Sequence, residues 1–217
     1  YPHARSLRNG TNMMKALEDN VAARGIEVRF STSAERLISD GDGSIIGLWT
    51  QNEQTGAVSV AASRGVILAC GGFEANAEMQ RQYWQLNPVM TAAFRGNTGD
   101  GIRMAQDVGA DLWHMWHFHG SYGFRHPDPA FPFGIRTKRL PDWVPEHSET
   151  NAQMSWILVD GEGGRFMNEY QPYLQDTGHR ALDVMNPDTQ QYPYIPCYII
   201  VDDPGRKMYP LGGVVFN

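Results

Sequence analysis

An apolar run that stops at two glycines places the strongest constraint on how this chain folds. Residues 65–72 read GVILACGG, and the segment from Val66 to Ala69 has the short aliphatic pattern of a buried β-strand. Gly71 and Gly72 then remove every side chain at the point where the strand would end. Bare backbone at a strand end is typical of a place where another group approaches the main chain closely. We therefore expect a buried strand here, with some other group lying against its glycines.

The segments before this run predict a helix and then a layer of strands. Apolar residues recur at helical spacing in residues 11–24, with Thr11 as the expected N-cap and Gly25 as the stop. Residues 26–70 alternate or run apolar, and they predict a strand, a hairpin with a tight glycine turn, and further strands. The first part of the chain is therefore expected to be α/β.

The segments after the run predict two short helices and then a different texture. Helices are expected within residues 74–84 and, after a glycine-bearing turn, within residues 97–113. Near residues 113–117 the chain becomes rich in Trp, His, Phe and Pro, which indicates a boundary and a mixed α+β part beyond it. A strand–turn–strand is expected in residues 155–169 and a buried strand in residues 194–203.

The composition narrows the classes of protein to which the chain can belong. A net charge of −6 and the lack of a Lys/Arg cluster argue against a general nucleic-acid binder. No apolar stretch approaches the roughly 20 residues that a membrane-spanning helix needs. Cys70 and Cys197 are too few for a disulfide framework or a metal cage, so we expect no metal site and a reducing, cytoplasmic location. The chain starts at Tyr1 and stops where a strand is under way, which indicates a piece of a longer protein.

The sequence GNTGDGIRMAQ, residues 96–106, places a glycine-rich turn at the start of a helix. Unpaired amides and the positive end of the helix dipole gather at such a turn, where they can hold an anionic or electron-rich ligand edge. Asp100, between Gly99 and Gly101, can then accept a hydrogen bond from a ribityl or ribose hydroxyl. The residues alone leave a plainer alternative open, in which Asp100 only caps the helix.

Two further stretches carry groups that could act on a substrate. WHMWHFHG, residues 113–120, holds three histidines among aromatic residues that could wall a pocket. These histidines either face a substrate or pack, since no set of carboxylates or thiolates supports a metal. GEGGRFMNEYQPY, residues 161–173, ends in Tyr173. A tyrosine is a plausible acid or base only where a pocket shifts its pKa from about 10, so a packing role for Tyr173 stays open.

The order of these motifs resembles that of the succinate dehydrogenase/fumarate reductase flavoprotein family, which includes the 3-ketosteroid dehydrogenases and related enoate reductases. The resemblance covers essentially the whole chain through GIEVRFSTSAERLISDGDGSIIGL, GVILACGGFEANAEMQRQY, NTGDGIRMAQDVGADL and ILVDGEGGRFMNEYQPY. It implies residues 1–116 as the middle of an α/β FAD-binding domain and residues 117–217 as part of an α+β capping domain. It also implies that the glycine-rich βαβ turn for the FAD pyrophosphate and the C-terminal segment that completes the site lie outside this chain.

The same resemblance implies which residues face the cofactor, FAD. Ala34 matches the place where family members touch the adenine by backbone. Residues 69–71 match a strand end beside the cofactor, where relatives often have Thr in place of Cys70. Residues 98–100 match the T-G-D-G turn near the flavin, which favours the cofactor-binding interpretation of Asp100 over capping. The implied cofactor-binding residues are Ala34, Ala69, Cys70, Gly71, Thr98, Gly99 and Asp100.

On the substrate side, the resemblance implies Tyr173 as the residue that transfers a proton. A tyrosine after the Asn-Glu stretch is similar to the 3-ketosteroid dehydrogenases, whereas fumarate reductases place an arginine there. His119 and Glu149 match substrate-facing positions of the family. An FAD-dependent oxidoreductase is thus implied, acting on a carbon–carbon bond next to a carbonyl of a small, steroid-like molecule, with an unknown electron partner. A fumarate or enoate reductase is the alternative, and the isolated chain could instead be a folded binding module without FAD.

Overall fold

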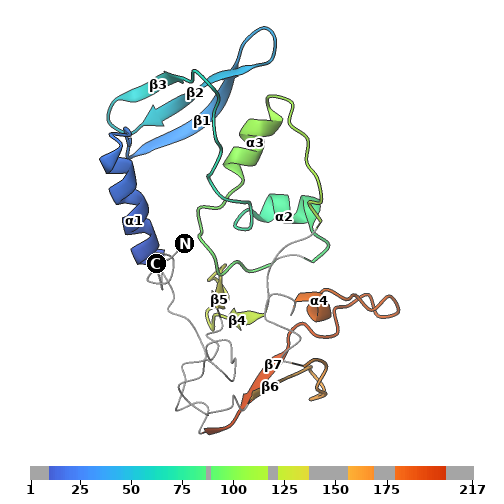
Figure 1. The fold of residues 1–217 in the computed structure, drawn as a ribbon. Helices are drawn as coiled ribbons and strands as arrows, with labels where there is room; N and C mark the ends of the chain where they lie inside the picture. The colour runs from blue at the N-terminus through green and yellow to red at the C-terminus, as the bar shows by residue number, and fades with distance from the viewer. Residues whose placement is uncertain (1–9, 87–88, 117–121, 137–155, 169–178, 204–217) are drawn as a thin grey trace. The chain divides into compact units, whose positions relative to one another are not determined.

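The computed structural model describes residues 10–86, 89–116, 122–136, 156–168 and 179–203. The chain divides into two compact units, residues 1–67 and residues 68–217, and each unit is described by itself (Figure 1). The domain boundary expected between residues 116 and 117 concerns the whole protein and stays a prediction.

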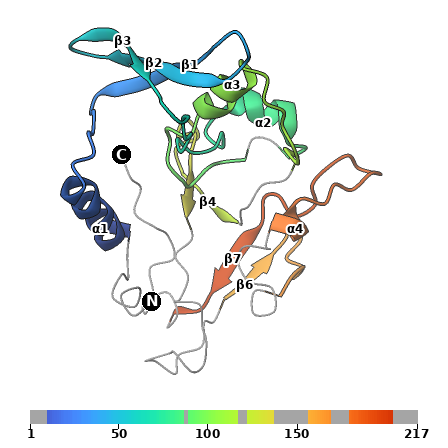
Figure 2. The ribbon, with the colours of Figure 1, turned by 45° about the horizontal axis from the view of Figure 1, so that its top comes forward.

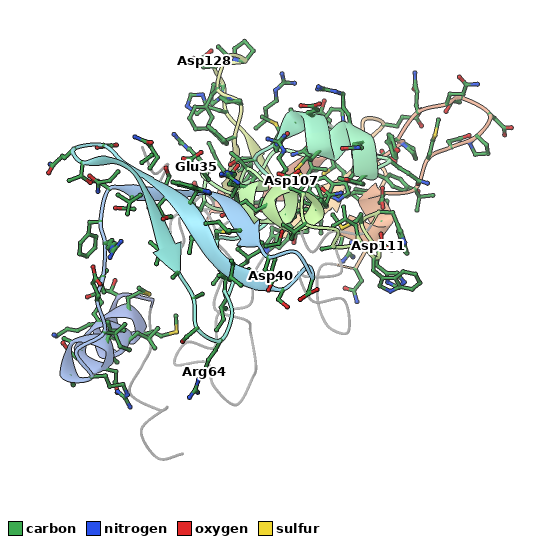
Figure 3. The ribbon with its side chains drawn as sticks, turned by 90° about the horizontal axis from the view of Figure 1, so that it is seen from above. Glu35, Asp40, Arg64, Asp107, Asp111 and Asp128 are labelled. Carbon is green, nitrogen blue, oxygen red and sulfur yellow. The ribbon has the colours of Figure 1, made fainter. Side chains whose placement is uncertain are left out.

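In its described residues, the first unit holds one helix and a three-stranded antiparallel sheet (Figures 1 and 2). Its elements are α1 (Gly10–Ala23), β1 (Thr32–Ser39), β2 (Ile45–Asn52) and β3 (Gly56–Ala61), with β2 in the middle. The carboxylate of Asp40, at the end of β1 in Figure 3, accepts hydrogen bonds from the amides of Asp42 at 3.0 Å and Ser44 at 2.9 Å. The side-chain oxygen of Asn52 does the same for two amides of the turn between β2 and β3. The predicted hairpin with its tight glycine turn is confirmed.

Helix α1 confirms the helix predicted near the N-terminus but not its cap. It begins at Gly10, so Thr11 lies inside the helix and the prediction of Thr11 as N-cap was wrong. Gly25 follows the end of the helix with φ +62°, the left-handed conformation in which glycine commonly stops a helix. No residue of α1 is buried, and Leu17 on its apolar face is 53% exposed.

Two apolar segments that flank the sheet do not form the strands predicted for them. Residues 26–30 and 66–69 have no strand partner among the described residues, and Phe30 and Ile67 are 82% and 91% exposed. A strand is stable only when a neighbouring strand takes up its backbone hydrogen bonds. Because residues 66–69 have no such neighbour in the described part of the chain, the prediction of a buried strand before the glycines was wrong.

The described part of the second unit holds short helices and two antiparallel strand pairs, β4 with β5 and β6 with β7. Its elements are α2 (Ala77–Tyr83), α3 (Asp100–Gln106), β4 (Gly123–Arg125), β5 (Gly134–Arg136), β6 (Trp156–Val159), α4 (His179–Leu182) and β7 (Tyr198–Val201). Helices α2 and α3 confirm the two helices predicted after the glycine pair, and they lie side by side in Figures 1 and 2. No helix in the described ranges is long and apolar enough to cross a bilayer.

Strand β6 pairs with a different strand from the one predicted. The first strand and the turn expected in residues 155–169 are present. In place of the second strand, the described residues form only an isolated β-bridge between Val159 and Arg165. Strand β6 instead pairs with β7, which lies in the segment 194–203. Strand β7 alternates between exposed and half-buried residues, with Ile200 54% exposed, so the prediction of a fully buried strand there was wrong.

Candidate functional site

Two glycine-bearing turns of the second unit are joined by main-chain hydrogen bonds. We call them the Gly71 turn, residues 71–76, and the Gly99 turn, residues 96–101. The amide of Gly99 donates to the carbonyl of Gly72 at 2.9 Å, and the amide of Ala75 donates to the carbonyl of Asn97 at 3.0 Å. Two motifs that stand apart in the sequence therefore form one local structure.

Asn76 ties the start of α2 to the Gly99 turn. Its side-chain oxygen accepts hydrogen bonds from the amides of Glu78 and Met79, each at 3.1 Å, as an N-cap asparagine does. Its side-chain nitrogen donates to the carbonyl of Thr98 at 2.8 Å. One side chain thus satisfies both a helix end and the turn beside it.

The start of α3 separates the two interpretations of Asp100. Gly99 is the N-cap of α3, with φ +86°, and it offers no side chain to cap the helix. Asp100 is the first helical residue, and its carboxylate accepts a hydrogen bond from the hydroxyl of Thr98 at 2.9 Å. The interpretation of Asp100 as the helix cap was therefore wrong. Because its side chain is exposed and a carboxylate has several acceptor sites, Asp100 can accept a further hydroxyl.

The segment before the Gly71 turn lies directly against α3. A Cβ atom at Gly101 would overlap the sulfur of Cys70, so a larger residue at this helix position would have to displace that sulfur. Gly101 is buried, whereas Ala69 and Cys70 are exposed. This close approach brings residues 69–71 to the same place as residues 98–100.

The space above the two glycines of the Gly71 turn is occupied by side chains of the chain itself. Gly71 has φ +84°, and a Cβ atom there would overlap the side-chain oxygen of Asn97. A Cβ atom at Gly72 would stand 2.8 Å from a carboxylate oxygen of Glu74. The side-chain nitrogen of Asn97 donates to the other carboxylate oxygen of Glu74 at 2.6 Å. No motif singled out these two residues, and the signal for them is their place, Glu74 directly after GGF and Asn97 directly before TGDG.

Ala34 lies in the first unit, at an irregular point of an edge strand. It pairs with Thr50 of β2, and the register shifts between Ala34 and Arg36. The shift leaves Glu35, labelled on β1 in Figure 3, as the extra residue of a β-bulge. Bulges at sheet edges redirect the backbone and are common beside binding sites. The exposed backbone of β1 near Ala34 is therefore suited to contact a ligand.

The three residues predicted to face the substrate lie outside the described residues, and their roles stay predictions: His119, Glu149 and Tyr173. The aromatic side chains just before them are exposed, with Trp113 83% exposed and the ring of His114 stacked on it at 4.7 Å. In the described ranges, no three His, Cys, Asp or Glu side chains come together as a metal site would require.

Comparison with known proteins shows what this arrangement is similar to. The family described as the FAD binding domain matches residues 1–195. A 3-oxosteroid 1-dehydrogenase of Mycolicibacterium smegmatis is 30% identical over 215 residues, which cover 94% of this chain and 34% of that protein. A probable fumarate reductase of Shewanella frigidimarina is 24% identical over 206 residues, which cover 89% of this chain and 29% of that protein.

A solved structure gives the same result for the fold. The 3-ketosteroid Δ1-dehydrogenase from Sterolibacterium denitrificans, in complex with 1,4-androstadiene-3,17-dione, matches with a TM-score of 0.67 and 29% identity. The match covers 88% of this chain and 32% of that chain. The chain thus spans about a third of the length of these relatives, and its mixed α/β structure is that of FAD-binding flavoenzymes of this type.

Proposed function

The chain belongs to the family of FAD-binding domains, and on that premise we propose that it is part of an FAD-dependent oxidoreductase. The proposed reaction is the dehydrogenation or reduction of a carbon–carbon bond next to a carbonyl, as in 3-ketosteroid dehydrogenases. The observation that carries the proposal is the joining of the Gly71 turn to the Gly99 turn, which gathers all the predicted FAD-binding residues of the second unit. The similarity of nearly the whole chain to a 3-oxosteroid 1-dehydrogenase supports the same class of reaction.

The chemistry of the described residues fits FAD. Asp100 has an exposed carboxylate with capacity for a hydroxyl of the cofactor, and Thr98 and Gly99 form the turn that presents it. Ala69, Cys70 and Gly71 are exposed beside the same turn, and we assign them backbone contacts with the cofactor. The bulged edge of β1 supports the assignment of Ala34 to the adenine. When bound, FAD supplies the acceptor or donor of the hydride.

The substrate end of the site is assigned to residues 117–217, as part of a capping domain. Tyr173 is assigned the transfer of a proton beside the carbonyl, and His119 and Glu149 are assigned contacts with the substrate. The steroid in the similar 3-ketosteroid Δ1-dehydrogenase supports a substrate of steroid size and low charge. A cytoplasmic location and an electron partner of unknown identity complete the proposal.

The cofactor assignment is tested by titrating the full-length apoprotein with FAD. Asp100→Ala is expected to raise the dissociation constant about tenfold, since one hydrogen bond to a charged group is lost. Asp107→Ala is the matched control, because Asp107 is also exposed but lies at the other end of α3 (Figure 3). A wild-type protein that retains no FAD once the unbound cofactor has been removed would refute the proposed function.

The role of Tyr173 is tested separately with Tyr173→Phe. The variant is expected to bind FAD as the wild type does, but to lose the bleaching of the flavin by a 3-ketosteroid. Turnover equal to that of the wild type would exclude Tyr173 as the group that transfers the proton.

A fumarate or enoate reductase is the second candidate, favoured by the similarity to the probable fumarate reductase of Shewanella frigidimarina. Reoxidation of the reduced flavin by fumarate, without bleaching of the oxidised flavin by steroids, would select this candidate. The isolated 217 residues are a third case, a folded module without cofactor, which FAD titration of that chain alone decides.

A further inference from the structure

We propose that Asn97 and Glu74 form a clamp that holds the Gly71 turn and the Gly99 turn in the relative position in which they bind FAD. The proposal rests on the proposed function, because it assigns these two residues a positioning role at the same site. Neither residue is assigned a contact with the cofactor or the substrate. Their contribution is expected to come entirely through the main chain of the two turns.

Asn97 contacts the Gly71 turn at three separate points. Its carbonyl accepts the amide of Ala75 at 3.0 Å, and its side-chain nitrogen donates to Glu74 at 2.6 Å. Its side-chain oxygen lies in the space that a Cβ atom of Gly71 would take. A single residue of the Gly99 turn therefore sets the position of the other turn by hydrogen bonding and by contact.

Glu74 is itself fixed from the side of α2. The buried side chain of Gln80, 4% exposed, donates to the carbonyl of Glu74 at 2.7 Å. The same side chain donates to the carbonyl of Val89 and accepts from its amide, both at 2.8 Å. Gln80, with all its side-chain polar atoms bonded, thus holds the main chain from which the Glu74 side chain reaches Asn97.

The chemistry of this pair makes its loss consequential. A hydrogen bond that a carboxylate accepts is stronger than one between neutral groups, and the contact of 2.6 Å is short. Without it, the two turns are held in place by fewer hydrogen bonds. Those that remain include the bond from the Gly99 amide to the Gly72 carbonyl and the bond from the Ala75 amide to the Asn97 carbonyl. A site whose turns must be reordered by the ligand binds that ligand more weakly than a site ordered in advance.

The clamp is tested by exchanging its donor and acceptor in the full-length protein. Asn97→Ala and Glu74→Ala are each expected to raise the FAD dissociation constant about tenfold. Asn97→Asp alone places two carboxylates face to face and is expected to bind FAD no better than Asn97→Ala. The double variant Asn97→Asp/Glu74→Gln restores a hydrogen bond between a carboxylate and an amide, and its affinity is expected to return to within about threefold of wild type.

A matched asparagine outside the site separates positioning from general stability. The side-chain oxygen of Asn186 accepts the amides of Asp188 at 2.9 Å and Thr189 at 3.3 Å within its own local turn. Asn186→Ala is therefore expected to lose local hydrogen bonds and leave the FAD affinity unchanged. Hydrogen exchange of the Gly99 amide in the apoprotein is expected to be faster in Asn97→Ala and unchanged in Asn186→Ala.

The outcomes distinguish the clamp from the proposed function. Unchanged FAD affinity in Asn97→Ala, or a folded exchanged pair that binds no better than Asn97→Asp, would overturn the clamp and leave the proposed function standing. A wild-type protein that binds no FAD would overturn the proposed function. Hydrogen exchange of the Gly99 amide would then still show whether Asn97 joins the two turns.

Discussion

Replacement of Gly71 by alanine is expected to destabilise the protein more than the same replacement at a glycine of similar backbone conformation. Gly71 has φ +84° and Gly109 has φ +93°, both in the left-handed region, where an L-residue costs about 1–2 kcal/mol. A Cβ atom at Gly109 meets nothing within 4 Å, whereas one at Gly71 would overlap the side-chain oxygen of Asn97. Only Gly71→Ala must therefore displace Asn97 from its position.

The extra cost at Gly71 follows from the hydrogen bond that the displacement breaks. Asn97 donates to the carboxylate of Glu74, and loss of a hydrogen bond to a charged group costs about 1.5–3 kcal/mol. Added to the backbone strain, this gives an expected loss of about 2.5–5 kcal/mol for Gly71→Ala. Gly109→Ala carries the strain alone, so we expect a loss of about 1–2 kcal/mol.

Urea unfolding of the apoprotein measures both losses, provided that the slope of the free energy with urea is the same in each variant. A double-mutant cycle adds a direct test of the cause. In the Asn97→Ala background, the cost of Gly71→Ala is expected to fall to that of Gly109→Ala, because the displaced side chain is already absent. Equal losses for the two single alanine variants in the wild-type background would refute the argument that Asn97 fills the space above Gly71.

Four further predictions concern other residues. Burial raises the pKa of the Cys197 thiol, whereas Cys70 is exposed. A thiol reagent at neutral pH is therefore expected to modify Cys70 well before Cys197, and equal rates of modification would contradict this. Because the folded state favours the neutral Cys197 thiol, the stability gained is present below the thiol's unfolded pKa and lost as the pH rises through its folded one, which unfolding at increasing pH measures. Leu158 is 1% exposed, and Leu158→Ala is expected to lower the free energy of unfolding by about 2–5 kcal/mol. Ile200, on the paired strand, is 54% exposed, and Ile200→Ala is expected to lower it by roughly 0.5 kcal/mol. Urea unfolding in which Ile200→Ala loses more stability than Leu158→Ala would contradict this. Asn76→Ala removes the cap of α2 and is expected to lower the free energy of unfolding by about 1–2 kcal/mol, with an unchanged melting temperature as the result against it.

Local patterns were sufficient to predict the helices and the hairpin. Helices α1, α2 and α3 follow apolar spacing, and the turn between β1 and β2 follows its closely spaced glycines. In each case the stabilising bonds join residues that are close in sequence, so a short stretch contains the information. The order of the motifs was also sufficient to identify the family, which the match over residues 1–195 bears out.

Pairing between distant residues could not be predicted in this way. Residues 66–69 have the composition of a strand, but a strand forms only beside a second one, and the described residues contain none that pairs with it. Strand β6 pairs with β7 instead of with the return of its own turn, because a ladder can form with any extended segment that packing brings alongside.

The glycines of GVILACGG show most clearly which features follow from the sequence and which follow only from the tertiary structure. The sequence by itself determined that some group approaches the backbone at Gly71 and Gly72, since glycine is the residue that permits such an approach. Only the tertiary structure decided that Asn97 and Glu74 fill that space. These two residues are 23 positions apart, and no helical or strand spacing relates them. They meet because the Gly99 turn folds onto the Gly71 turn, and that contact exists only in the folded chain.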